Sequence, residues 1–230
     1  MQPKRSGMIK KIAILFSGNG SNLEALIKAL HQKYFRILPK KSPLCDFQGG
    51  IISGIESSFL NISEEECQAE DFGVEVVLAL SNKANAYGIT RAKRLGIPTE
   101  ILESKAFLKR EEFDRALVQI LQEKGINLCV LAGFMRILTP IFTAQIPAIN
   151  IHPSLLPLFK GAEGIKESFE SPMKLGGVSV HWVSDELDSG EIIAQGVIAK
   201  ENNQEDYEAK IHKLEHYLYP LAVLEVLKGI

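Results

Sequence analysis

A short apolar run that ends in a glycine-rich turn and leads straight into a helical pattern limits the possible folds of this chain more than any other feature. Residues 10–16 (KKIAILF) predict a buried strand, because the run is short and apolar and stops at a turn. Residues 17–22 (SGNGSN) form that turn, and apolar side chains recur at helical spacing over residues 23–31. A strand, a tight loop and a helix in this order indicate an α/β fold.

The same alternation continues along the chain. Strand-like runs recur at residues 74–80, 99–102 and 127–132, and helical patterns lie between them at residues 84–95 and 107–123. Regular alternation of this kind is typical of a mostly parallel sheet that helices cover on both faces.

After Pro140 the pattern changes. Residues 148–151 predict a short strand, and residues 177–183 and 191–199 predict two more, joined by a polar turn at residues 184–190. Two strands joined by a turn form a hairpin, so we expect an antiparallel extension of the sheet towards the C-terminus.

Two segments depart from this regular pattern. Residues 203–228 predict a long helix, which Pro220 should kink or interrupt, because a proline removes one helical hydrogen bond and clashes with the preceding turn. Residues 36–73 mix Pro, Gly, Ser and a Glu run with few periodic apolar residues. We interpret them as a loop-like, peripheral insertion, and we expect a short Gly/Ser linker in their place to leave turnover within a few-fold.

Composition excludes several classes of function. The formal net charge of −2 gives no general attraction to nucleic acid or anionic lipid, so a bound phosphate must be met locally. No apolar run approaches the length of a membrane span, and the one after the basic N-terminus is too short for a signal peptide. We expect a cytoplasmic protein without membrane or nucleic-acid partners.

The cysteines Cys45, Cys67 and Cys129 are widely spaced and form no CxxC pair. Neither a disulfide framework nor a zinc site is indicated, and we expect no metal. Cys129 lies in an apolar run, so it is expected to be a small core residue.

The glycine loop is the first candidate site. It lacks the third glycine of the dinucleotide fingerprint and the Lys-Ser/Thr of a P-loop. It would still present backbone N–H groups, with the Ser21 and Asn22 side chains, at a helix N-terminus, which suits one phosphate. The alternative is a plain strand-to-helix turn in which Asn22 or Ser21 caps the helix.

Asn150 and His152 form the second candidate site. They lie two apart in a strand, so their side chains project from the same face, at the strand end where open α/β sheets place ligands. An amide and an imidazole together can hold an oxyanion and manage a proton. The alternative is that the histidine is structural.

Two further segments carry candidate residues. The turn at residues 184–190 holds Asp185, Glu186 and Asp188, and is either solvated or folded towards His152, where one carboxylate could favour the charged imidazole. The sequence does not choose between the three acids. Residues 131–138 (LAGFMRIL) could line a slot for a flat aromatic ligand with an acidic group, or pack as ordinary core.

Together these segments resemble the phosphoribosylglycinamide formyltransferases, folate-dependent enzymes of purine synthesis. They cover nearly all of the chain except the tail before Ile9 and the insertion. The matching stretches, in the order in which that family has them, are ILFSGNGSNLEAL, LSNKANAYGITRAKRLGIP, VLAGFMRILTP, NIHPSLLP, GVSVHWVSDELDSG and LEHYLYPL.

The resemblance implies a single formyltransferase domain over residues 1–230. A Rossmann-like, nucleotide-binding half would occupy about residues 9–140 and a folate-binding, catalytic half about residues 141–230, with the active site between them. The co-substrate would be 10-formyltetrahydrofolate, the acceptor would be glycinamide ribonucleotide, and the protein would be a monomer or a homodimer.

The resemblance also implies roles for individual residues. The catalytic residues would be Asn150, His152 and Asp188, with His181 behind them. The ribonucleotide would be bound at its phosphate and its glycinamide by Gly20, Ser21, Asn22, Lys213 and Glu215. The folate would be bordered by Arg110, Met135, Arg136, Ile137, Leu138 and Asn150.

In the mechanism that the resemblance implies, the glycinamide amine attacks the formyl carbon on N10 of the folate. Asn150 and protonated His152 donate hydrogen bonds to the tetrahedral oxyanion, and Asp188 keeps His152 charged. Residues 158–164 (LFKGAEG) depart from the family pattern, because Glu163 stands where a histidine is common. The ligand contacts of this loop are therefore not carried over.

Other functions fit the sequence less well. A formyltetrahydrofolate hydrolase typically has an extra N-terminal regulatory domain, for which this chain has no room, and a methionyl-tRNA formyltransferase needs a C-terminal RNA-binding domain. A dehydrogenase would need the missing third glycine. The hydrolase, and a non-catalytic nucleotide-binding protein on the same fold, stay as alternatives to formyl transfer.

Overall fold

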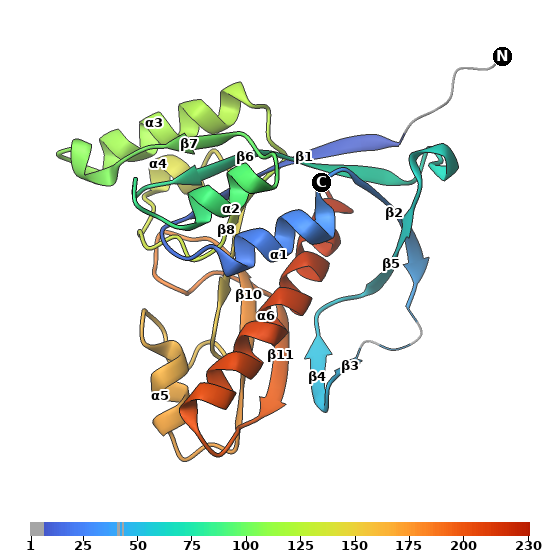
Figure 1. The fold of residues 1–230 in the computed structure, drawn as a ribbon, viewed down its shortest axis with the longest axis vertical. Helices are drawn as coiled ribbons and strands as arrows, with labels where there is room; N and C mark the ends of the chain where they lie inside the picture. The colour runs from blue at the N-terminus through green and yellow to red at the C-terminus, as the bar shows by residue number, and fades with distance from the viewer. Residues whose placement is uncertain (1–6, 41, 43) are drawn as a thin grey trace.

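One twisted sheet with helices on both faces makes up the protein (Figure 1). The computed structural model describes residues 7–40, 42 and 44–230. The strands are β1 (Met8–Phe16), β2 (Lys33–Pro39), β3 (Cys45–Phe47), β4 (Gly50–Ser53), β5 (Ser57–Ile62), β6 (Phe72–Ser81), β7 (Thr99–Ile101), β8 (Leu128–Leu131), β9 (Ala148–His152), β10 (Leu175–Trp182) and β11 (Ile192–Ala199). The helices are α1 (Ser21–Leu30), α2 (Gly88–Arg94), α3 (Arg110–Glu123), α4 (Pro140–Thr143), α5 (Gly164–Glu170) and α6 (Gln204–Leu227), with single 3₁₀ turns at Glu64–Glu66 and Ser104–Ala106.

The centre of the sheet is parallel. The strand order is β3-β4-β11-β10-β9-β8-β1-β6-β2-β5, and β7 pairs with β6 beside this path. Strand β1 lies parallel to both β6 and β8, and β9 continues the parallel set beyond β8. Residues 12–16 of β1 are buried, as expected for a strand covered on both faces. The predicted mostly parallel α/β fold is confirmed.

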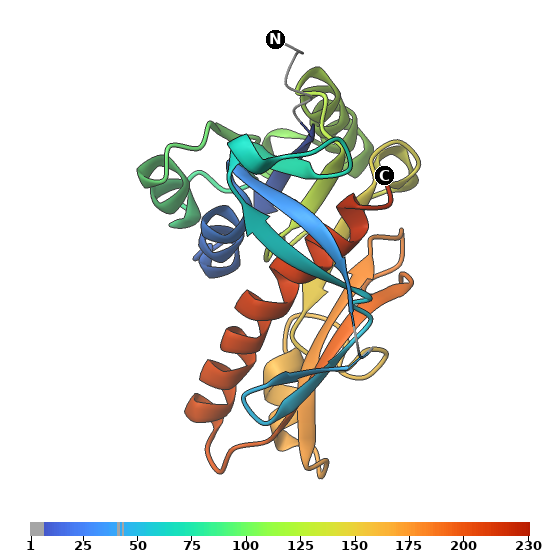
Figure 2. The same cartoon turned by 90° about the vertical axis from the view of Figure 1, so that its right-hand side faces the viewer.

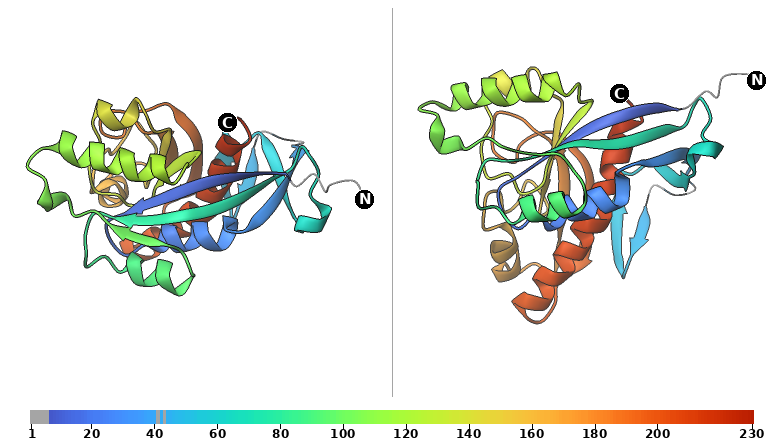
Figure 3. Two further views of the ribbon diagram at one scale, coloured as in Figure 1. Left: turned by 90° about the horizontal axis from the view of Figure 1, so that it is seen from above. Right: turned by 45° about the horizontal axis from the view of Figure 1, so that its top comes forward.

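The helices divide the core between the two faces (Figure 3). Helices α1, α2 and α6 pack on one face, whose core includes Leu26, Ile89 and Leu218. Helices α3 and α4 cover the other, with Leu117 and Cys129 in its core. Cys129 is fully buried, which confirms the expected core position.

The predicted hairpin towards the C-terminus is also confirmed. Strand β10 lies antiparallel to both β9 and β11. The loop between β10 and β11 carries the acidic residues singled out from the sequence, and it leaves β10 beside the amino end of β9, where Trp182 pairs with Ile149.

The loop-like character predicted for residues 36–73 is wrong, because about half of this segment lies in strands. Strand β2 pairs with β6 and β5 at one end of the sheet, and β4 pairs with β11 at the other. Figure 2 shows these blue to teal strands reaching from β6 to the orange strands β10 and β11. Phe47, Ile52 and Ile55 are buried in the core. The strands are too short, and their buried positions too few, for a periodic pattern to appear in the sequence.

Helix α6 does not stop at Pro220. It runs unbroken for 24 residues with the proline inside it, so the predicted interruption is wrong. Pro220 is buried, as are Leu218 and Tyr219 before it and Ala222 and Val223 after it. Packing on both sides of the proline offsets the local cost of about 3 kcal/mol.

Two other helices are shorter than predicted. Helix α2 begins at Gly88 rather than residue 84, because the amide of Gly88 donates to the carbonyl of Gly18 instead of bonding within a helix. Helix α3 begins at Arg110 rather than residue 107.

Candidate active site

Asn150 and His152 lie at the carboxyl end of β9 and point to the same side of the sheet, as their spacing predicts. Strand β10 runs beside them and places His181 opposite Asn150. The Asn150 Nδ2 atom lies 3.2 Å from His181 Nε2, and His181 Nδ1 donates to the carbonyl of Trp182 at 2.9 Å. Three polar side chains from two neighbouring strands therefore meet at one sheet end.

Asp188 joins this group from the loop between β10 and β11. Its carboxylate lies 3.5 Å from His152 Nδ1 and 3.7 Å from His181 Nε2. It also accepts the amide of Gly161 at 2.9 Å. Asp188 has a positive φ of 48°, a left-handed conformation that aspartate tolerates better than most residues. The structure thus selects Asp188 among the three acids of this loop and leaves Asp185 and Glu186 exposed.

The acid and both histidines of this group are buried. His152 is 5% exposed, His181 3% and Asp188 9%. Burial acts to raise the pKa of Asp188, but hydrogen bonds from His181 and the Gly161 amide, with the charges of both histidines, outweigh it and lower that pKa. The site therefore keeps a buried negative charge next to two imidazoles.

His152 is held between two acceptors. Its Nε2 donates to the carbonyl of Phe159 at 2.7 Å, while its Nδ1 faces Asp188. Only a doubly protonated ring can donate in both directions. Phe159 has a positive φ of 55° in the loop that covers the histidine, and an oxyanion would have to replace its carbonyl at Nε2.

The glycine loop is built differently from the capped turn considered above. Gly20 is the N-cap of α1, with φ 77°, and no side chain caps the helix. Capping by Ser21 or Asn22 is therefore wrong, and the first-turn amides of α1 stay available to an anion. A side chain at Gly20 would meet the backbone of Gly88 at 2.6 Å, so this position needs glycine for its conformation and for space.

Arg91, which the sequence reasoning missed, braces this loop. Its guanidinium donates to the backbone carbonyl and the side-chain oxygen of Asn19, both at 3.0 Å. It also pairs with Glu24, which contacts Lys28 and Arg94 as well. Hydrogen bonds with Lys28 and Arg91 lower the pKa of Glu24 to about 2. The sequence signal was present in the helical run after residue 84, but nothing there indicated the contact with Asn19.

The loop after β8 presents a partly apolar surface. Met135 and Ile137 are exposed, whereas Leu138 is only 2% exposed and belongs to the core. The Arg136 guanidinium lies 4.1 Å from the ring centre of Phe113. Burial lowers the pKa of Arg136, the negative charge of Asp114 opposes this, and the positive charge of Arg110 adds to it. Two cations therefore stand beside the exposed apolar residues.

On α6 the structure separates two residues that were expected together. Glu215 is buried and bonds His212 Nδ1 at 2.6 Å, an interaction that the sequence reasoning missed. Lys213 is exposed and instead lines a surface hollow of about 320 Å³ beside Gln48 and Asp206. Residues two apart on a helix point to different sides, which accounts for the separation.

Comparison with known proteins decides the family. A sequence model described as formyl transferase matches residues 50–223. The chain is 33% identical to the phosphoribosylglycinamide formyltransferase of Haemophilus influenzae over 225 residues, which cover 96% of this chain and 89% of that protein. The chain belongs to the phosphoribosylglycinamide formyltransferase family.

Other relatives agree with this membership. A crystal structure of phosphoribosylglycinamide formyltransferase from Campylobacter jejuni shares 50% identity and a TM-score of 0.78, and the match covers 96% of this chain and 99% of that one. The trifunctional purine biosynthetic protein adenosine-3 of Gallus gallus is 35% identical over 95% of this chain, but only 18% of that longer protein is covered. The resemblance inferred from the motifs is confirmed, as is the assignment to an enzyme family.

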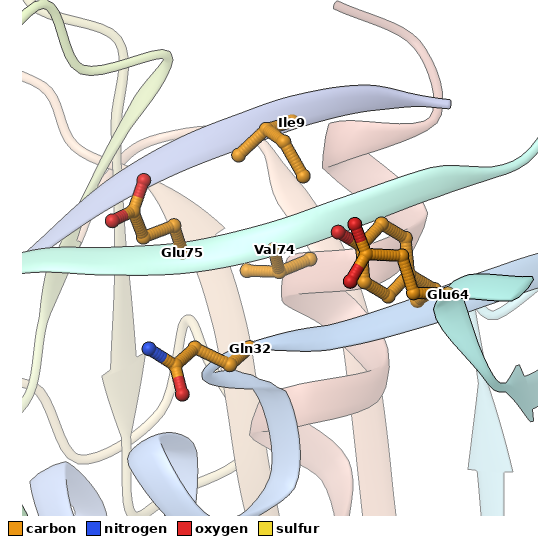
Figure 4. A pocket seen from close by; sticks show the side chains of 6 residues that line it. Ile9, Gln32, Glu64, Val74 and Glu75 are labelled. Atoms are coloured by element: carbon orange, nitrogen blue, oxygen red, sulfur yellow. The ribbon is translucent and has the colours of Figure 1, made fainter. Parts of the chain in front are cut away.

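One surface hollow lies away from the residues of the candidate site. It has a volume of about 410 Å³ and opens beside β1, β2 and β6, where none of the residues considered above lines it (Figure 4). Its lining residues are Ile9, Gln32, Tyr34, Glu64, Val74 and Glu75. In this formyltransferase the candidate site is marked by the polar side chains that converge on Asp188, and this hollow is separate from it.

The described residues carry neither a cluster of metal-ligating side chains nor a membrane-spanning helix. No group of three or more His, Cys, Asp or Glu side chains within residues 7–40, 42 and 44–230 is placed to hold a metal ion. Among the helices of the same residues, none is both long and apolar enough to cross a membrane.

Proposed function

We propose that this protein transfers the formyl group of 10-formyltetrahydrofolate to the amine of glycinamide ribonucleotide. The observation that carries the proposal is the meeting of Asn150, His152 and Asp188 at one sheet end, in a chain of the formyltransferase family. The convergence supports a catalytic protein over a non-catalytic nucleotide-binding one, because a binding module has no need for a buried acid beside two imidazoles.

The proposed reaction is a direct transfer. The amine nitrogen attacks the formyl carbon and forms a new C–N bond, and the carbonyl becomes a tetrahedral oxyanion. Collapse of the oxyanion breaks the bond between that carbon and N10 of the folate. The proton lost by the attacking amine ends on N10, so tetrahydrofolate leaves as the neutral amine.

Asn150 and His152 would stabilise the oxyanion. The amide Nδ2 and the imidazole Nε2 are the two donors, and each well-aimed donor is worth about 3 kcal/mol in the transition state. His152 Nε2 must first exchange the carbonyl of Phe159 for the oxyanion, whereas its Nδ1 can stay on Asp188. Asp188 would keep the ring oriented and protonated throughout.

The two substrates would approach from opposite sides of this group. The phosphate of the ribonucleotide would bind the amides of Gly20, Ser21 and Asn22, and its glycinamide would reach Glu215. The folate would lie along Met135 and Ile137, with Arg136 and Arg110 near its acidic end. Leu138 would support this surface from the core.

We also propose the wider setting of the enzyme. Residues 1–230 would form one formyltransferase domain that acts in the cytoplasm on these small molecules, as a monomer or a homodimer, without a metal and without nucleic-acid or membrane partners. The net charge of −2 supports this, because it offers no general attraction to polyanions.

One experiment separates the possible functions. The protein is incubated with 10-formyltetrahydrofolate, with and without glycinamide ribonucleotide, and folate absorbance and released formate are followed. Consumption that depends on the ribonucleotide is the expected result. Release of formate without the ribonucleotide would instead identify a hydrolase, and no consumption in either case would identify a non-catalytic protein.

A further inference from the structure

Ser17 stands where three loops meet. It follows β1, the middle one of three neighbouring parallel strands, and is 4% exposed. Its hydroxyl donates to Asn82 Oδ1 at 2.6 Å and accepts the amide of Met135 at 2.8 Å. Its own amide donates to the carbonyl of Gly133 at 3.0 Å. One small side chain thus ties together the loops that follow β6, β1 and β8.

These loops have different proposed tasks. The loop after β1 begins the phosphate site, and the loop after β8 carries Met135 and Ile137 of the folate surface. We propose that Ser17 is a positioning residue that fixes the folate-binding loop against the nucleotide-binding loop. The formyl group of the folate and the amine of the ribonucleotide are thereby held in the right relative position. This inference rests on the proposed function and deepens it.

The chemistry of the position favours serine. A hydroxyl donates and accepts at once, so it can satisfy the side-chain oxygen of Asn82 and the backbone amide of Met135 together. The nucleotide-binding loop has further anchors, because Gly18 accepts the amide of Gly88 and Asn19 is held by Arg91. Loss of the hydroxyl should therefore loosen the folate-binding loop more than the nucleotide-binding loop.

Ser81 offers a matched control. It ends the neighbouring strand β6, is fully buried and also has a hydroxyl that donates and accepts. Both of its hydrogen bonds go to Lys83 in its own loop, at 2.9 and 3.1 Å. Ser81→Ala removes a buried hydroxyl of the same kind whose hydrogen bonds stay within a single loop.

The test compares Ser17→Ala with Ser81→Ala. The affinities for tetrahydrofolate and for glycinamide ribonucleotide are measured separately by calorimetry, and kcat and KM are measured for 10-formyltetrahydrofolate. We expect Ser17→Ala to weaken tetrahydrofolate binding about tenfold and to raise the folate KM in step, with ribonucleotide affinity within about threefold of the parent. Ser81→Ala should leave both affinities within about twofold, and Ser17→Thr should restore folate binding.

Several outcomes would overturn the inference. If Ser17→Ala and Ser81→Ala changed the ligand affinities equally at similar thermal stability, Ser17 would have only a packing role. The same conclusion would follow if Ser17→Ala weakened the binding of both ligands equally. If Ser17→Ala fails to fold, Asn82→Ala should still weaken tetrahydrofolate selectively, and an unchanged affinity would contradict the proposal. The binding measurements do not depend on turnover. If the unmodified protein showed no transfer activity, the proposed reaction would be refuted, but the binding comparison would still test the role of Ser17.

Discussion

The Asp188 carboxylate is the charge that the other polar side chains of the candidate site surround. Its pKa is lowered from the ordinary value of 3.8, because the contacts with His181, Gly161 and His152 outweigh the effect of burial. The depressed pKa means that the stabilising contribution of Asp188 is fully present above about pH 4. It is lost as the pH falls through the lowered value. The carboxylate is therefore ionised throughout the neutral range.

Asp188→Asn should remove the charge while keeping the size of the side chain and its ability to accept the Gly161 amide. If Asp188 acts by holding His152 protonated, turnover should fall about a hundredfold or more, with small changes in ligand affinity. Steady-state kinetics across pH measure this directly.

Asp185→Asn and Glu186→Gln provide the matched controls, because both acids lie in the same loop but are exposed. Their turnover should stay within a few-fold of the parent. Near-parental turnover of Asp188→Asn at every pH would show that the acid has no electrostatic role, and that the loop is an ordinary solvated connection.

Ser21→Asp should place a negative charge among the first-turn amides of α1. Since Gly20 leaves these amides without a side-chain cap, the new carboxylate would compete with a phosphate for them. Ribonucleotide binding should weaken at least tenfold while tetrahydrofolate binding stays nearly unchanged, as calorimetry with each ligand can measure. A similar loss of both ligands would argue against a phosphate site here.

Part of the candidate site could be predicted from the sequence and part could not. Spacing alone placed Asn150 and His152 on one face, because a strand repeats every two residues. Distance in the sequence hid the rest: Arg91 reaches Asn19 across 72 residues, and Ser17 reaches Met135 across 118. The choice of Asp188 over Asp185 and Glu186 depended on how one loop folds, for which side-chain chemistry gives no signal.

At the scale of elements, the segment from β2 to β5 contributes more than its composition suggested. Strand β4 covers the edge of β11, and Phe47 beside it packs on Tyr217 of α6 with ring centres 4.8 Å apart. Near the C-terminal end of α6, the carboxylate of Glu225 accepts the amide of Ser57 at 3.1 Å. The expectation that a short linker could replace residues 36–73 is therefore revised, since the linker would remove core residues and expose two strand edges.

Phe47→Ala should destabilise the fold by about 3 kcal/mol, because it removes a buried ring and leaves a cavity against Tyr217. The native protein that remains should keep its kcat, since the ring lies away from the residues proposed for catalysis. Denaturant unfolding and kinetics on the same samples test both statements. Leu44→Ala, at an exposed position of the same segment, should change stability by less than about 0.5 kcal/mol.

The elements that could be predicted are those with a local signal. The strands of the parallel centre carry continuous apolar runs, and α3 carries a helical repeat, so both appear in the sequence. Strand β4 depends on β11 far along the chain, and β2 pairs with β5 and β6, from which β3 and β4 separate it in the sequence. Helix α6 continues past Pro220 because tertiary packing supports it on both sides. Interactions that are distant in sequence decided each of these differences.

At the scale of the whole molecule, residues 33–62 join the two ends of the sheet. Strand β2 pairs with β6 and β4 pairs with β11, although four strands separate β6 from β11 in the sheet order. The two halves of the chain expected from the sequence therefore share one continuous sheet and one connecting segment. We expect a single unfolding transition rather than two, and calorimetric and van't Hoff enthalpies that agree.

The pairing of β4 with β11 also sets an order of events during translation. Ser53 and Gln195, which pair, lie about 140 residues apart, so on the ribosome β4 waits for a strand made near the end of synthesis. Until β11 emerges, Ile51 and Ile52 have only the short strand β3 as a partner, and the other edge of β4 stays unpaired. A chain truncated after residue 190 should therefore fail to unfold cooperatively and should be cleaved rapidly by protease. A stable core formed by that truncated chain would show instead that the first half folds before its last strands are made.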